Sequence, residues 1–167
     1  MELTLALGGG GVKGISHVGV LRCLESAGFK IGAIAGTSAG AVIGAAYAAG
    51  YTPVQLAEKI QEIDQSRLFD RTPDDGPSLL GLKGFSKFLV DLFNNCTFDD
   101  LQIPFACTAV DLKTEREIIL TKGRVIDAVH ASMAIPGIFP PIHLGDALLV
   151  DGAVVDPVPV AVARWLL

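Results

Sequence analysis

A serine flanked by glycines is the first feature of this 167-residue chain that could carry chemistry. Ser38 lies in the pentapeptide Gly36-Thr37-Ser38-Ala39-Gly40, after a short apolar run and before the alanine-rich segment 41–49. This order is typical of a strand, a sharp turn and a helix, with the serine hydroxyl pointing away from the sheet. The N-terminus of the helix would also favour negative charge beside the serine. The pattern predicts a nucleophile, although a glycine-rich turn with a serine as helix cap would have the same sequence pattern.

A run of four glycines is the second such feature. Residues 8–14 read Gly-Gly-Gly-Gly-Val-Lys-Gly; they follow the apolar run Leu3 to Leu7 and precede a segment with near-helical spacing of apolar residues. Backbone N–H groups of consecutive glycines can form an oxyanion hole beside a nucleophile, because no Cβ obstructs the approach. Lys13 could hold this loop or attract an anionic head group, and it could equally be a solvated lysine.

Two nucleotide sites and a plain turn are the alternatives for this glycine segment. A dinucleotide site would want an acidic residue at the end of the second strand, where the chain has Gly36-Thr37-Ser38 instead. A P-loop would need a serine or threonine after its lysine, whereas Gly14 follows Lys13. A tight turn needs fewer than four glycines. The oxyanion hole is the interpretation that we favour.

The third candidate is Asp151, which follows the short apolar run Leu148 to Val150 and precedes Gly152. Apolar surroundings raise the pKa of a carboxyl group, which would make Asp151 a better base for a serine hydroxyl. Asp146 and Asp156 bracket it in the sequence. The first reads as a turn residue after a glycine and the second as a helix cap before a proline, so Asp151 is the preferred base.

A Ser-His-Asp triad is the rival arrangement. In an α/β-hydrolase the histidine follows the acid along the chain, and no histidine follows the candidate base here. His17, His130 and His143 are therefore interpreted as structural or surface residues. Ser132 is a further hydroxyl, but it lacks the flanking glycines of a nucleophile turn.

Composition argues against several other classes of function. The net charge is −5 and lysine and arginine form no cluster, which argues against nucleic acid as a partner. No apolar run reaches the roughly 18 residues of a membrane span, and from the first residues we expect no signal peptide. Three scattered cysteines, Cys23, Cys96 and Cys107, read as free thiols. The sequence predicts a cytoplasmic protein without metal or cofactor, with peripheral membrane association as a further option.

Apolar patterning predicts alternating strands and helices. Strands are expected at residues 3–7, 31–35, 103–110, 117–121 and 148–150, and helices at about 15–27, 41–49, 54–63, 125–133 and 160–167. Periodicity is weak from 64 to 100, apart from an apolar helical stripe of Phe85, Phe88, Leu89, Leu92 and Phe93. We expect this stripe to pack on the core, with a lid or lipid-contacting helix over the active site as the alternative.

The three candidate segments occur in the order 9–14, 36–40 and 151–153, and with this order the sequence resembles the patatin-like phospholipase family. The likeness extends over nearly the whole chain, including residues 131–141 and 157–160. It implies an α/β fold, a three-layer α/β/α sandwich with a central, mostly parallel sheet, in a single domain 1–167. Residues 64–100 would be a lid or lipid-contact insertion. In the family a further strand normally follows the last helix, and an exposed sheet edge in its place would favour self-association.

The resemblance also implies a reaction, the hydrolysis of lipid acyl esters by a Ser-Asp dyad without histidine or metal. Ser38 would be the nucleophile that becomes acylated, and Asp151 would be the base. The remaining residues implied are the oxyanion-hole backbone of Gly9, Gly10, Gly11, Val12 and Lys13, and the motif glycines Gly14, Gly36, Gly40 and Gly152. The expected partner is a lipid or ester substrate at a membrane surface. The alternative is a catalytically idle lipid-binding or regulatory protein that retains the fold.

Overall fold

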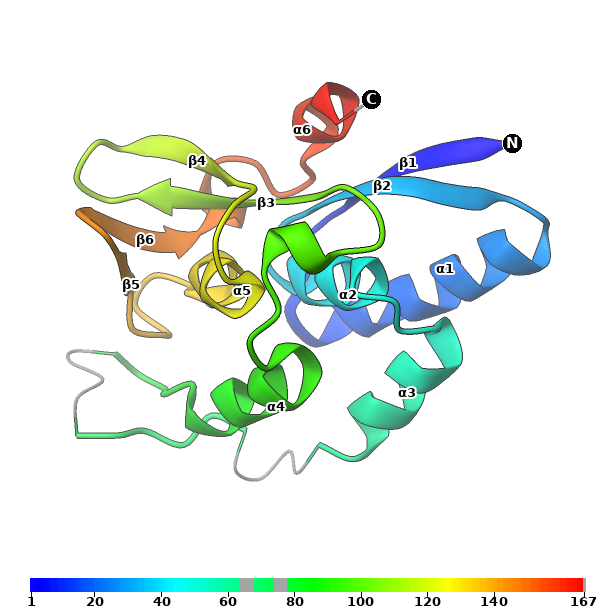
Figure 1. The fold of residues 1–167 in the computed structure, drawn as a ribbon. Coiled ribbons are helices and arrows are strands. Elements are labelled where there is room, and N and C mark those ends of the chain that lie inside the picture. Colours follow the sequence, from blue (N-terminus) through cyan, green and yellow to red (C-terminus); the bar gives the residue numbers. More distant parts are fainter. Residues whose placement is uncertain (64–67, 74–77, 167) are drawn as a thin grey trace.

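The computed structural model describes residues 1–63, 68–73 and 78–166, and Figure 1 shows their arrangement. Within these residues the strands are β1 (Glu2–Leu7), β2 (Lys30–Gly36), β3 (Phe105–Asp111), β4 (Arg116–Leu120), β5 (Ile142–Leu144) and β6 (Ala147–Asp151). The α-helices are α1 (Ser16–Ser26), α2 (Ala39–Ala48), α3 (Pro53–Gln61), α4 (Lys83–Phe93), α5 (Val125–Met133) and α6 (Val160–Trp165). Short 3-10 turns are η1 (Gly11–Ile15), η2 (Phe98–Asp100) and η3 (Gly152–Val154).

The strands form one mixed sheet with the order β1-β2-β3-β6-β5, and β4 pairs with β3 outside this path. β1, β2 and β3 pair in parallel, whereas β4 and β6 run antiparallel to β3, and β5 runs antiparallel to β6. Within the described residues, β1, β2, β3 and β5 therefore share one direction. Parallel neighbours need a crossover connection, and α1 lies in the one that joins β1 to β2.

β2 and β6 meet end to end along the same side of β3. Residues 34–36 of β2 pair with 105–107 of β3, and residues 149–151 of β6 pair with 111–109. β4 pairs with 107–111 and so occupies the opposite side. Because β2 runs parallel to β3 and β6 runs antiparallel, their carboxyl ends face each other across Thr108. The topology thus brings together the segments that follow β2 and β6.

Helices cover both faces of the sheet (Figure 1). α1, α2 and α5 pack on one face with α3 and α4 outside them, and α6 lies on the other face over β1 and β2. The alternation of side chains along a strand explains the division. Large residues such as Leu7, Ile34 and Phe105 join the main core, whereas Ala6, Ala35 and Ala106 pack with Val162 and Ala163 of α6. The predicted three-layer sandwich with a central, mostly parallel sheet is confirmed.

The apolar stripe on α4 packs into the main core. Its buried members are Phe85, Leu89, Leu92 and Phe93, and Phe88 packs against them half-buried. Each fully buried side chain of this kind stabilises the fold by roughly 1.5–3 kcal/mol. A lid or lipid-contact role for residues 64–100 stays a prediction, and its residues 64–67 and 74–77 lie outside the described part of the chain.

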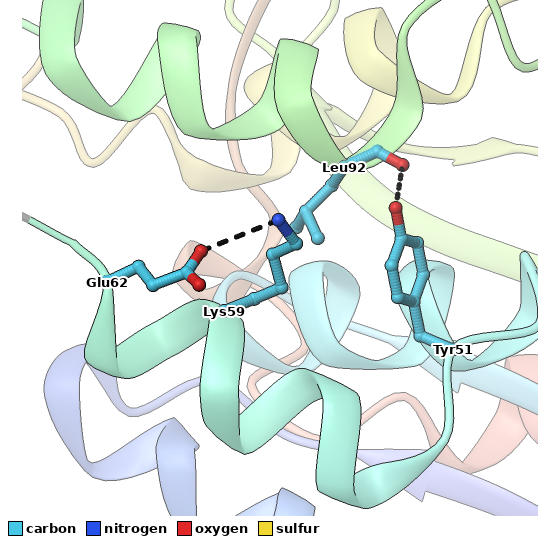
Figure 2. Close-up of polar contacts among 4 residues, drawn as sticks. All are labelled: Tyr51, Lys59, Glu62 and Leu92. Atoms are coloured by element: carbon cyan, nitrogen blue, oxygen red, sulfur yellow. Dashed lines mark hydrogen bonds and ion pairs between the residues drawn. The ribbon is translucent and has the colours of Figure 1, made fainter.

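The segment before α3 is tied to the end of α4 through Tyr51. Figure 2 shows the Tyr51 hydroxyl donating a hydrogen bond to the carbonyl oxygen of Leu92 over 3.1 Å. This carbonyl belongs to the last turn of α4, where carbonyl groups lack partners within the helix. At the far end of α3, Lys59 and Glu62 form an ion pair over 3.5 Å, also drawn in Figure 2. That pair is solvent-exposed and adds little stability.

β5 is not predicted from the sequence. This strand has three residues, which is too short for a period-2 pattern, and it directly follows Pro140 and Pro141. It forms because the turn at Gly145 folds it back onto β6. No helix in the described ranges has the length and apolarity needed to cross a bilayer.

Candidate active site

Ser38 lies at a sharp turn between β2 and α2, where it is the N-cap of the helix. Its backbone angles are φ 55° and ψ −122°, a region that costs a non-glycine residue roughly 1–3 kcal/mol. A Cβ on Gly36 would lie 2.6 Å from Cα of Ala41, and one on Gly40 would overlap the carbonyl oxygen of Leu7. The close approach of strand, turn and helix therefore requires glycine at both positions.

The Ser38 hydroxyl donates a hydrogen bond to Oδ2 of Asp151 over 2.6 Å. Both residues are buried, with 3% of Ser38 and 2% of Asp151 exposed. The other carboxylate oxygen, Oδ1, accepts the backbone N–H of Ala153 over 2.8 Å, which fixes the orientation of the carboxylate. The pair is separated by 113 positions in the sequence. Their contact follows from the end-to-end meeting of β2 and β6.

Burial raises the pKa of Asp151 above its usual range, because the ionised carboxylate loses its hydration. The hydrogen bonds from Ser38 and from the Ala153 backbone act in the opposite direction, since they stabilise the ionised form. The site thus holds a carboxylate of raised pKa in contact with a hydroxyl. This combination can act in general base catalysis.

The C-terminal end of α5 contacts both members of the pair. Ser132 Oγ accepts the backbone N–H of Ser38 over 2.9 Å, and the Met133 sulfur lies 3.7 Å from Ser38 Oγ. The carbonyl oxygen of Ala134, the residue that caps α5, accepts the backbone N–H of Asp151 over 2.9 Å. From the sequence, Ser132 is only a rival nucleophile, and its hydrogen bond to the Ser38 backbone becomes evident in the structure.

The glycine loop packs directly on the serine turn. A Cβ on Gly9 would lie 3.3 Å from Cβ of Ser38, and a Cβ on Gly14 would overlap that of Ala39. The absence of side chains at these two positions lets the loop reach the nucleophile candidate. Gly10 and Gly11 have φ values of 157° and 55°.

Two of the five predicted oxyanion donors already have backbone partners. The N–H of Gly9 donates to the carbonyl oxygen of Pro157 over 2.9 Å, and the N–H of Lys13 donates to the carbonyl oxygen of Gly10 over 3.1 Å. Among the described residues, the loop N–H groups without a hydrogen bond are those of Gly10, Gly11 and Val12. Of the five predicted donors, these three have N–H groups that are free to bind an oxyanion, and their role stays a prediction.

The three histidines lie among the described residues, and none of them forms a hydrogen bond with Ser38 or Asp151. His17 Nε2 donates to the carbonyl oxygen of Gly8 over 2.8 Å and so holds the start of the glycine loop. His130 lies 3.0 Å from the Ser86 hydroxyl, and burial lowers its pKa. His143 is exposed on β5. The geometry thus offers a Ser-Asp pair and no histidine to extend it.

A buried hydroxyl pair lies where β2 and β6 meet. The side chains of Thr37 and Thr108 share a hydrogen bond of 2.8 Å, and Thr37 Oγ1 also donates to the backbone carbonyl of Asp156 over 3.1 Å. A Cβ on Gly152 would overlap the Thr108 hydroxyl. Asp156 is therefore held by Thr37 through its backbone carbonyl oxygen. Asp146 is exposed in the turn after β5. Neither rival carboxylate is hydrogen-bonded to Ser38.

Comparison with known proteins gives the relatives of this chain. The sequence model described as Patatin-like phospholipase matches residues 5–164. An NTE family protein of Mycobacterium tuberculosis is 35% identical over 163 residues, which are 96% of this chain and 45% of that protein. Lysophospholipase NTE1 of Candida albicans is 34% identical over 162 residues, which are 93% of this chain and 12% of that protein. The chain spans less than half the length of these relatives.

Two solved structures share the fold. VipD from Legionella pneumophila is similar with a TM-score of 0.72 at 14% identity, over 93% of this chain and 46% of VipD. The type III effector protein ExoU is similar with a TM-score of 0.53 at 16% identity, over 81% of this chain and 41% of ExoU. At these identities the likeness concerns architecture. With nearly its whole length matched by the family model, the chain belongs to the patatin-like phospholipase family.

Proposed function

We propose that this chain hydrolyses carboxylic esters of lipids, with Ser38 as the nucleophile and Asp151 as the general base. The observation that carries the proposal is the 2.6 Å hydrogen bond between a buried hydroxyl and a buried carboxylate, made at a strained turn. Membership of the family and the likeness to Lysophospholipase NTE1 support a lipid ester as the substrate. The chemistry that fits is acyl transfer through a covalent acyl-enzyme.

In the first half of the reaction, Ser38 Oγ attacks the ester carbonyl carbon while Asp151 Oδ2 takes the hydroxyl proton. The negative charge that develops on the carbonyl oxygen is stabilised by the free N–H groups of the glycine loop. The N-terminal end of α2 favours negative charge beside Ser38. At the end of α5, the carbonyl oxygen of Ala134 accepts the backbone N–H of Asp151 and so helps to hold the base in place.

In the second half, the proton on Asp151 passes to the departing alkoxide, and the acyl group stays on Ser38. A water molecule then gives a proton to Asp151 and attacks the acyl carbon. Collapse of that intermediate breaks the bond from Oγ to carbon, returns the proton to Ser38 and releases the carboxylic acid. The N–H of Ala153 binds Oδ1 and so keeps Oδ2 turned toward the reacting atoms.

Covalent labelling and ester turnover test this proposal. A fluorophosphonate probe is expected to modify the peptide containing Ser38, as identified by mass spectrometry, and the chain is expected to cleave a p-nitrophenyl ester. Ser38→Ala should lose labelling and lower turnover about 10³-fold or more. Ser26→Ala removes an exposed hydroxyl on α1 and should retain both. Equal turnover of the wild type and Ser38→Ala would contradict the proposal and favour the idle lipid-binding alternative.

The pH dependence of turnover should report the ionisation of Asp151. The base must be ionised to take a proton, so kcat/KM is expected to fall as pH decreases through the pKa of Asp151 in the free enzyme. Since burial raises this pKa, the midpoint of the acid limb should lie above the ordinary value of about 3.9 for an aspartate. A stopped assay of ester hydrolysis from pH 3.5 to 8 gives the midpoint. A midpoint at or below the ordinary value would contradict the assignment.

A further inference from the structure

The backbone N–H of Ser38 donates to a side chain of another helix, Ser132 of α5. The two residues are 94 positions apart, and Ser132 is fully buried with 0% of its surface exposed. The bond is made by the residue whose backbone is strained, at φ 55°. An N–H buried without an acceptor is costly, so removal of the Ser132 hydroxyl would favour rotation of the turn.

The same helix end also sets the position of the base. Ala134, two residues after Ser132, accepts the backbone N–H of Asp151 over 2.9 Å. Ser132 and Ala134 together connect both members of the pair to one rigid support, since α5 is buried along most of its length. The distance between the Ser38 hydroxyl and the carboxylate therefore depends on α5 as well as on the turn itself.

We infer that Ser132 is a positioning residue, whose hydroxyl holds the Ser38 turn so that Oγ points at Oδ2 of Asp151. The effect of this positioning on catalysis rests on the proposed function. The hydroxyl of Ser132 takes no part in bond making, and it acts through the backbone of Ser38. Misplacement of a reacting group by about 1 Å can reduce a rate about 100-fold.

Kinetics of Ser132→Ala give the first test. We expect kcat to fall about 10-fold to 100-fold with KM within about twofold, because ester binding does not involve this hydroxyl. Labelling of Ser38 by a fluorophosphonate should slow by a similar factor. Ser132→Thr keeps an acceptor oxygen and should recover at least part of kcat. If Ser132→Ala does not fold, Ser132→Cys, with a similar shape and a weaker acceptor, should change kcat in the same direction.

Titration of the Asp151 carboxyl carbon by NMR gives a second test that needs no turnover. In the described chain the pKa of Asp151 is set by burial and by its hydrogen bonds to Ser38 and Ala153, without a charged neighbour. The bond from Ser38 lowers that pKa, so its loss in Ser132→Ala should move the titration midpoint to higher pH. A purely structural defect would lower the folded fraction and leave the midpoint of the folded protein unchanged.

Ser86→Ala is the matched control. It removes a half-buried serine hydroxyl from the neighbouring helix α4, where Ser86 bonds to Leu82 and His130 and forms no hydrogen bond with Ser38 or Asp151. It should change neither kcat nor the Asp151 midpoint. An unchanged Asp151 midpoint in Ser132→Ala, or an equal change in Ser86→Ala, would overturn the inference. Absence of turnover in the wild type would instead contradict the proposed function, so the two proposals fail separately.

Discussion

Asp151→Asn is expected to lower ester turnover about 10³-fold or more while leaving the fold intact. Asparagine has nearly the same shape as aspartate, but its amide cannot take the proton from the Ser38 hydroxyl. The 2.6 Å contact with Ser38 is the only hydrogen bond that this hydroxyl makes to a carboxylate among the described residues. Measurement of kcat/KM on a p-nitrophenyl ester, with circular dichroism to check folding, gives the result.

The control for this prediction is Asp146→Asn. Asp146 lies five positions earlier and is exposed in the turn between β5 and β6, so its change should leave turnover within about twofold. Equal loss in both variants would indicate a general effect of charge. Retention of more than about a tenth of wild-type turnover in Asp151→Asn would contradict the role of Asp151 as the base.

Gly40→Ala is expected to lower the free energy of unfolding by about 3 kcal/mol or more. The added Cβ would overlap the carbonyl oxygen of Leu7 and lie 2.7 Å from that of Gly8. Both obstacles are backbone atoms, so no side-chain rotation relieves them, and β1 must move away from α2. For a chain of this size the loss corresponds to a decrease in Tm of roughly 6–12 °C. Thermal denaturation followed by circular dichroism measures it.

Gly19→Ala is the matched substitution in open space. Gly19 is an exposed residue inside α1, and a Cβ there meets no atom within 4 Å. Because alanine is a better helix former than glycine, this variant should be more stable by up to about 1 kcal/mol. A Gly40→Ala protein as stable as the wild type would show that the turn tolerates a side chain, and the requirement for glycine would then be wrong.

The glycine positions around the serine could be predicted from sequence because they fall within one short motif. Gly36 and Gly40 flank the serine within five residues, and both prove to be close to backbone atoms. The strand that ends at Asp151 is marked by its own apolar run. The contact of Ser38 with Asp151 is implied by the resemblance to the patatin-like family, and the structure places the two side chains together. Their catalytic roles remain the subject of the proposed function.

The surroundings of the pair could not be predicted in the same way. α5 is buried on nearly all sides, and its narrow polar side, formed by Asp127 and His130, does not include Ser132. Nothing local therefore shows that Ser132 faces Ser38. The donors of the glycine loop are a similar case, since glycine tolerates many backbone conformations and the residue types do not specify which N–H groups stay free.

The end-to-end meeting of β2 and β6 has a consequence for biosynthesis. β2, Ser38 and α2 all lie in the first third of the chain, whereas the candidate base Asp151 arrives with β6, close to the last residue described. During translation the Ser38 hydroxyl therefore emerges from the ribosome well before Asp151 does. Under the proposed function, a nascent chain therefore stays inactive toward esters until residue 151 has been made and has docked beside β3.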